Sequence, residues 1–121
     1  DWAPFIKAAI ERNPVSVTLA GRMSLDQVYE WLKQMNDASI YDGSRLAQPD
    51  EVANYRTGDG LEKAIFLGNI IHQRDPGQDI ELTAEGDLVV LKGPGEFHFA
   101  SAKGLQKTVR IPAVGVAPVA E

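Results

Sequence analysis

One stretch decides how this chain folds: Gly58-Asp59-Gly60-Leu61-Glu62-Lys63-Ala64, a glycine turn that leads directly into an apolar segment. Asp59 is placed to cap a helix here, because its side-chain oxygen can accept a hydrogen bond from an otherwise unpaired amide of the first turn. We expect this helix to run from near Asp59 to about His72. Its apolar residues cover most of its circumference: Leu61, Ala64, Ile65, Leu67, Gly68, Ile70 and Ile71. A helix that is apolar nearly all round lies buried at the centre of a domain.

The residues before this stretch predict mostly helices. Residues 3–12 have apolar side chains at helical spacing, and Ser24-Leu25-Asp26-Gln27 has the pattern of a capping box that opens a helix ending near Met35. A proline followed by acidic residues at 49–52 indicates a brief helical turn. Residues 15–19 instead alternate apolar and polar side chains, which predicts a short strand.

The residues after the central helix predict a sheet, because the hydrophobic period changes to two from Ile80 onward. Short glycine-containing turns separate the candidate strands, as is typical of an antiparallel meander. These strands are 80–83, 88–92, 96–101 and 107–111. The last residues, 113–121, show no regular period, and we expect a loosely held tail. The predicted fold is therefore a single α+β domain over residues 1–121, with helices packed on one face of a small antiparallel sheet.

The composition of the chain argues against several classes of function. A formal net charge of -5 and a pI near 5.0 argue against nucleic acid as a partner, because phosphate binding needs a clustered basic surface. The absence of cysteine removes thiol catalysis, disulfides and cysteine-ligated metal. No apolar stretch approaches the ~20 residues that span a bilayer. The chain begins at Asp1 without a signal-like segment, which indicates a processed chain, a trimmed chain or a domain of a longer protein and favours an exported one.

The glycine turn resembles the nucleophile-bearing helix start of transglutaminase-like (papain-type) thiol enzymes, whose motif reads Gly-Asp-Cys followed by an acidic and a small residue. Here the third position is Gly60. The resemblance covers about residues 24–100 and matches the family's histidine to His98, in Glu96-Phe97-His98-Phe99-Ala100. The only carboxylate side chain after His98 is that of Glu121, so the acid that orients the family's histidine has no counterpart. The resemblance implies a transglutaminase-like or papain-like core whose catalytic site has degenerated.

Other interpretations stay open from the residues alone. The turn at 58–60 is also explained without ancestry, as a cap in which glycines supply unusual backbone angles. His98 lies between two phenylalanines in a strand, so either the imidazole or the phenylalanine pair points at the core. One competing function is an enzyme of unrelated chemistry that uses His98 with Asp59 or Glu62. Another is a structural or assembly domain of a larger exported protein.

The function that we predict from the sequence is a non-catalytic domain that binds a peptide or a protein. Tyr41, Tyr55 and Arg56 flank the loop and helix start that would line a remaining cleft, and with Asp59 and His98 they are the candidate ligand-binding residues. Metal binding is not expected, because the two histidines of a cysteine-free chain lack the spacing of a zinc site. No cofactor is expected either.

Overall fold

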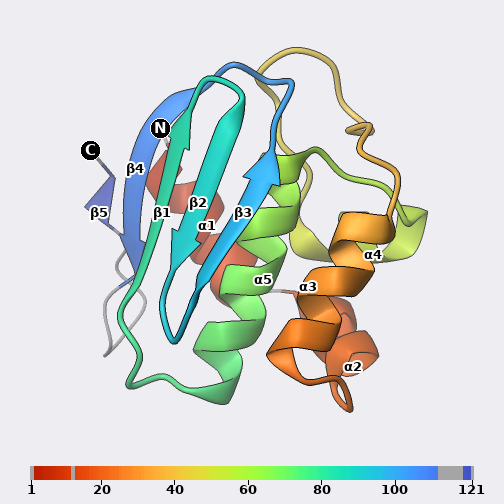
Figure 1. The fold of residues 1–121 in the computed structure, drawn as a ribbon, viewed down its shortest axis with the longest axis vertical. Helices are drawn as coiled ribbons and strands as arrows, with labels where there is room; N and C mark the ends of the chain where they lie inside the picture. The colour runs from red at the N-terminus through yellow and green to blue at the C-terminus, as the bar shows by residue number, and fades with distance from the viewer. Residues whose placement is uncertain (1, 12, 112–118, 121) are drawn as a thin grey trace.

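The computed structural model describes residues 2–11, 13–111 and 119–120, which form a layer of helices against one antiparallel sheet (Figure 1). The helices come first in the chain: α1 (Trp2–Glu11), α2 (Pro14–Ala20), α3 (Leu25–Gln34), α4 (Pro49–Tyr55) and α5 (Gly60–Arg74). The strands follow: β1 (Ile80–Glu85), β2 (Leu88–Lys92), β3 (Glu96–Ala100), β4 (Gln106–Ile111) and β5 (Val119–Ala120). The expected α+β class, with helices before strands, is confirmed.

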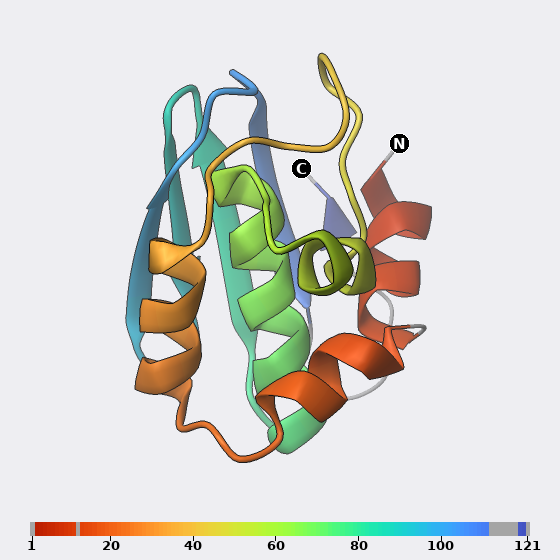
Figure 2. The same cartoon turned by 90° about the vertical axis from the view of Figure 1, so that its right-hand side faces the viewer.

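The central helix is α5, as the sequence predicts. Every residue from Gly60 to His72 is buried, and the helix packs on β1, β2 and β3 while the other helices surround it on its remaining sides (Figure 2). The inner face of the sheet supplies the opposite wall of the core, with Leu82, Val89, Leu91, Phe97, Phe99 and Val109. This packing of a sheet face on an apolar helix is what holds the two layers together.

The sheet has the order β3-β2-β1-β4-β5, and every neighbouring pair is antiparallel. The first three strands form the predicted meander, but the prediction is wrong for β4, which pairs with β1 instead of β3. The edge of β3 that does not pair with β2 is covered by Tyr29 of α3, so it is not open to β4. Residues 101–105 are tied to the start of α5 and to the loop before α4, so the chain crosses the end of the sheet to the other free edge.

The strand predicted over residues 15–19 is also wrong, because the structure places them in α2. Pro14 is at the first helical position, where its missing N–H costs nothing. The carboxylate of Asp50, at the start of α4, accepts hydrogen bonds from the amides of Val15 and Ser16 at 3.1 and 2.8 Å. This cap comes from a residue far along the chain, so local alternation could not reveal it.

The predicted loose tail lies mostly outside the described residues. Within it, Val119 and Ala120 form β5 and pair with Arg110 and Val109 of β4. At these two positions the structure differs from the prediction of a loosely held end.

The free edge of β3 is covered by one side chain of α3. The hydroxyl of Tyr29 donates a hydrogen bond to the carbonyl of His98 at 3.0 Å and accepts one from its amide at 3.2 Å. The same ring packs edge-on against Phe97 and Phe99. Because an open strand edge is a template for pairing with another chain, this contact protects the sheet from edge-to-edge association.

Replacing Tyr29 with phenylalanine is expected to lower the free energy of unfolding by about 1 kcal/mol, since ring packing remains while both backbone groups of His98 lose their partner. Urea denaturation measures this loss, and amide hydrogen exchange at His98 is expected to accelerate. Tyr55→Phe is the matched control, because Tyr55 is 64% exposed, and its effect is expected within about 0.5 kcal/mol of zero. Equal effects of the two substitutions would contradict the edge-capping role.

Candidate functional site

The start of α5 is held by the carboxylate of Asp59, which is 2% exposed. It accepts hydrogen bonds from the amide of Leu61 at 2.8 Å, the hydroxyl of Ser101 at 2.6 Å and the amide of Ala102 at 2.7 Å. The first bond is the cap that the sequence predicts. The other two tie the chain after β3 to the helix start, so both oxygens of Asp59 are used in holding the fold.

The neighbouring acid, Glu62, is fully buried and also serves the fold. One oxygen accepts the amide of Asp59 at 2.8 Å and completes a capping box. The other accepts the hydroxyl of Ser39 at 2.7 Å and the amide of Ala47 at 2.6 Å. Glu62 therefore fastens the loop between α3 and α4 to the core helix.

Two lysines also donate hydrogen bonds to the loop between α3 and α4. Lys63 is buried in α5, and its ammonium donates to the carbonyl of Met35 at 2.8 Å and to Asp37 at 2.6 Å. Lys103 follows β3 and donates to three backbone carbonyls of the loop at 2.6–2.9 Å, those of Tyr41, Gly43 and Arg45. The polar groups around the helix start thus satisfy one another, as buried polar groups must.

Gly60 is required by a close approach of backbones. A Cβ atom placed on Gly60 would lie 1.9 Å from the carbonyl oxygen of Ala100 and 2.6 Å from its carbon. The expectation that glycines here supply unusual backbone angles is wrong, because neither Gly58 nor Gly60 has a positive φ. The first turn of α5 instead packs directly on the last residue of β3, and no side chain fits between them.

His98 lies on the outer face of the sheet, while Phe97 and Phe99 point at the core. Its Nε2 is 2.7 Å from the carboxylate of Glu96, on the same strand. The imidazole therefore faces away from the helix layer. The structure does not bring His98 together with Asp59 or Glu62.

Three of the candidate residues lie in the segment that precedes α5: Tyr41 is half-buried in the loop before α4, and Tyr55 and Arg56 are exposed at the end of α4. The guanidinium of Arg45 lies over the ring of Tyr41, with its Cζ 3.9 Å from the centroid of that ring. The guanidinium of Arg56 lies over the ring of Trp31, with its Cζ 5.6 Å from the Trp31 centroid. Tyr55 precedes Arg56 and is 64% exposed. We call these five residues, Trp31, Tyr41, Arg45, Tyr55 and Arg56, the aromatic–arginine surface.

Tyr41 of this surface is hydrogen-bonded to α4, the helix that ends with Tyr55. The hydroxyl of Tyr41 hydrogen-bonds the carboxylate of Glu51, which is one helical turn before Tyr55. This bond, together with burial and the negative charge of Glu51, raises the pKa of Tyr41 above 10.0, against the opposing effect of Arg45. Because the folded-state pKa is raised, the contribution of this bond to stability is complete below pH 10 and is lost as the pH rises through the folded-state pKa.

Searches against protein-family models, curated proteins and solved structures each return no match for this chain. The site is therefore interpreted from its own geometry.

The aromatic–arginine surface contains three candidate residues of the sequence analysis and two further residues. The sequence indicated Tyr41, Tyr55 and Arg56 but not Arg45 or Trp31. The proximity of Arg45 to Tyr41 in one loop is a signal that the sequence does carry. The contact of Trp31 with Arg56 joins α3 to the end of α4, and only the folded structure shows it.

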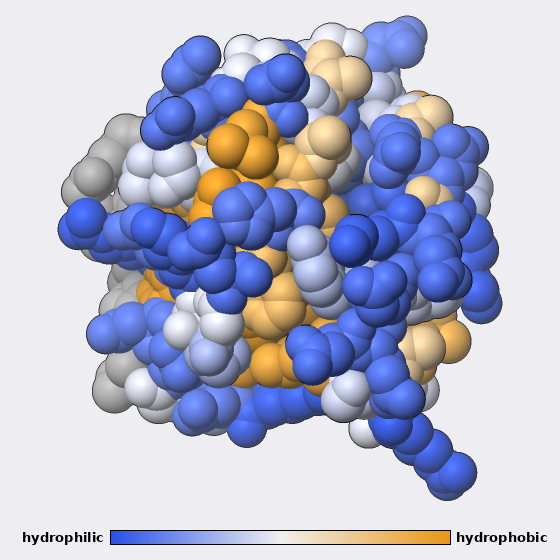
Figure 3. Space-filling view, in the orientation of Figure 1, coloured by the Kyte–Doolittle hydropathy of each residue, from blue (hydrophilic) through white to orange (hydrophobic). Residues whose placement is uncertain are grey.

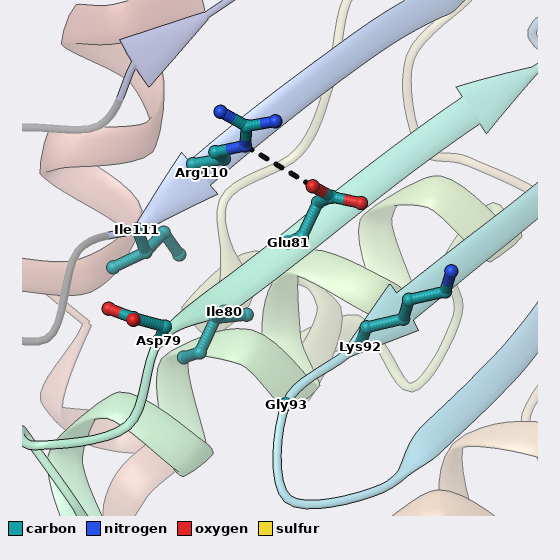
Figure 4. A pocket seen from close by; sticks show the side chains of 7 residues that line it. All are labelled: Asp79, Ile80, Glu81, Lys92, Gly93, Arg110 and Ile111. Carbon is teal, nitrogen blue, oxygen red and sulfur yellow. Dashed lines mark hydrogen bonds and ion pairs between the residues drawn. The ribbon is translucent and has the colours of Figure 1, made fainter.

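A separate hollow of about 530 Å³ lies at one end of the sheet (Figure 4). Residues of β1, β2 and β4 line it, among them Glu81 and Arg110, which form an ion pair at 3.2 Å. None of the candidate residues lines this hollow. Within the described part of the chain, no three histidine or acidic side chains are placed to hold a metal ion, and no helix has the length and apolar character needed to cross a bilayer.

Proposed function

We propose that this domain is a non-catalytic binding module that takes up an acidic segment of a partner protein or peptide on the aromatic–arginine surface. One observation carries the proposal. The guanidinium of Arg45 is stacked on the ring of Tyr41, that of Arg56 lies over Trp31 within cation–π range, and neither has an ion pair with a carboxylate in the described residues. Exposed Tyr55 lies next to Arg56 in the chain.

The composition of this surface suits protein recognition. Tyrosine, tryptophan and arginine are the residue types that dominate the energetics of protein interfaces. Stacking on a ring restrains a guanidinium without using its N–H donors, so the donors stay available for a carboxylate of the partner. Restraint before binding also reduces the entropy lost on association.

The backbone of Arg56 adds a second, independent argument. Its φ is 55°, the one positive φ of a non-glycine residue in the described chain, at the position that ends α4. Helices commonly end on glycine in this conformation, because other residues pay about 1 kcal/mol to adopt it. An arginine at such a position is consistent with selection for its side chain over local stability.

The same proposal includes the resemblance to a transglutaminase-like core. In its support, α5 begins against β3, the strand that carries His98, and the helical and strand segments follow in the order that the resemblance implies. Against it, the imidazole of His98 faces away from α5, and position 60 has no room for a nucleophilic side chain. The competing function, an enzyme that pairs His98 with Asp59 or Glu62, has less support, because these carboxylates hold caps and His98 contacts Glu96. A purely structural domain gives no reason for two arginines to be held over aromatic rings.

Peptides selected from a random display library against the wild-type domain test the proposal. We expect the selected peptides to be enriched in aspartate and glutamate. Their affinity is then measured against Arg45→Lys/Arg56→Lys, which keeps both charges but loses the stacking geometry, and we expect a loss of about tenfold or more. Arg22→Lys, at an exposed arginine in the turn after α2, is the matched control and should bind as the wild type does.

A further variant separates binding from stability. Arg56→Gly should relieve the left-handed backbone and lose the contact with Trp31, so its free energy of unfolding is expected within about 1 kcal/mol of the wild type. Its affinity for the selected peptides should nevertheless fall about tenfold. Peptides without acidic enrichment, or peptides that bind the double lysine variant as tightly as the wild type, would refute the proposal.

A further inference from the structure

The outer face of the sheet carries charges in a fixed order at one end. Reading across the strands in register, the residues are Glu96 on β3, Lys92 on β2, Glu81 on β1 and Arg110 on β4. The charges therefore alternate as minus, plus, minus, plus. We call these four residues the charge row; Figure 4 shows Lys92, Glu81 and Arg110 projecting from three adjacent strands.

The next row inward on the same face is uncharged at its centre. Val90 on β2 is in register with Thr83 on β1, and His98 and Thr108 flank them. In the row beyond it, Leu88, which is 46% exposed, is in register with the exposed Glu85 of β1, and the two would face each other across the interface argued below. Figure 3 shows hydrophobic residues at the surface among hydrophilic ones in this view, which includes the sheet. Antiparallel sheets often face water on one side, so exposure alone implies no partner.

The order of the charges does distinguish one partner. When a row that reads minus, plus, minus, plus is reversed and placed against a second copy of the row, every charge faces one of opposite sign. A two-fold axis parallel to the strands, between β1 and β2, performs this reversal and keeps the row at the same end of the sheet. Glu96 then faces Arg110 of a second copy, and Lys92 faces Glu81 of that copy.

The same operation places β-branched side chains of the uncharged row against each other. Val90 faces Thr83 of the second copy, and each contact occurs twice, as in every two-fold interface. The other two-fold axis in this plane runs perpendicular to the strands and carries the charge row to the opposite end, where Lys92 meets Leu88 and Glu81 meets the like charge of Glu85. Only the first axis pairs all four charges.

We propose that this face binds a second copy of the chain in a two-fold, sheet-on-sheet dimer. The charge row lies at the rim of the contact, where the ions keep part of their hydration and mainly select the orientation of the partner. Four strands about 4.8 Å apart and some five residues long span roughly 300 Å². This area is below the ~800 Å² per partner of a stable interface, so the dimer is expected to be transient, with a dissociation constant of about 100 µM to 1 mM.

A charge exchange tests the proposal. In Lys92→Glu, glutamate faces Glu81 of the other copy on both sides of the axis, and in Glu81→Lys, lysine faces Lys92. Each variant alone should therefore be monomeric. An equal mixture of the two restores both attractive pairs, so a heterodimer should form with an affinity near that of the wild type. Sedimentation velocity over a concentration series measures all three, with circular dichroism to verify folding.

The controls change charge elsewhere on the molecule. Lys7→Glu, on the exposed side of α1, and Asp42→Lys, in the loop before α4, make the same changes in net charge and should dimerise as the wild type does. A second exchange, Glu96→Arg mixed with Arg110→Glu, repeats the test if either central variant does not fold. A wild-type domain that stays monomeric to about 1 mM, or a mixture that fails to restore association, would overturn the proposal.

Discussion

Gly60→Ala is expected to lower the free energy of unfolding by about 3 kcal/mol or more. The added methyl would lie 1.9 Å from the carbonyl oxygen of Ala100, and both sides of this contact are backbone. No rotamer change can relieve the overlap, so α5 and β3 must separate. Because this junction also carries the hydrogen bonds of Asp59 to Ser101 and Ala102, their geometry is expected to be lost with it. Urea denaturation measures the change.

Gly68→Ala in the same helix is the matched control. A Cβ atom there would be 3.7 Å from a methyl of Leu91, which is ordinary van der Waals contact. Alanine in a helix interior is favoured over glycine by about 0.5–1 kcal/mol, so this variant should gain stability. Similar losses for Gly60→Ala and Gly68→Ala would show that the close approach to Ala100 has no special role.

Glu62→Ala is expected to cost about 3–5 kcal/mol. Its carboxylate accepts hydrogen bonds from Asp59, Ser39 and Ala47, and removing it leaves two buried amides and one hydroxyl without their acceptor. Each buried, unpaired group costs about 1–3 kcal/mol. Thermal or urea unfolding of the variant measures the sum, and amide exchange in residues 36–48 should accelerate because the loop loses its anchor.

Two further variants show how the loss in the free energy of unfolding depends on the Glu62 carboxylate. Glu62→Gln keeps the volume and one acceptor oxygen, so its loss should lie between those of the wild type and Glu62→Ala. Glu30→Ala removes an exposed carboxylate that pairs with Lys33 across one turn of α3, and it should change stability by less than about 1 kcal/mol. A loss at Glu62→Ala as small as that at Glu30→Ala would contradict the anchoring role.

Much of the fold is predictable because local signals agree with the tertiary structure. The Ser24 capping box, the apolar helix after Asp59 and the period-two strands from Ile80 each appear where the sequence places them. The failures are long-range. Residues 15–19 become helical through a cap from Asp50, and β4 pairs with β1 because Tyr29 covers the edge of β3.

In the candidate site too, local features are predictable from the sequence and long-range contacts are not. The cap at Asp59 is readable from the sequence, and so is its reciprocal partner, since an acid three residues after a capping residue is the signature of a capping box. The sequence interpretation considered Glu62 only as a possible reactive group. The orientation of His98 was open because a strand offers two faces, and the pairing of Arg56 with Trp31 depends on how α3 meets α4.

The start of α5 is closed by packing and holds the fold, and we therefore expect binding on the surface beside it. The reactivity of a thiol in Gly60→Cys tests this most directly, with Ser44→Cys in the exposed loop before α4 as the control. We predict that Gly60→Cys is strongly destabilised, and that its thiol, in whatever fraction stays folded, reacts far more slowly than that of Ser44→Cys until urea is added. A stable Gly60→Cys protein whose thiol has a depressed pKa and reacts as fast as the control would contradict the account, because it would reveal an open nucleophile site at this helix start.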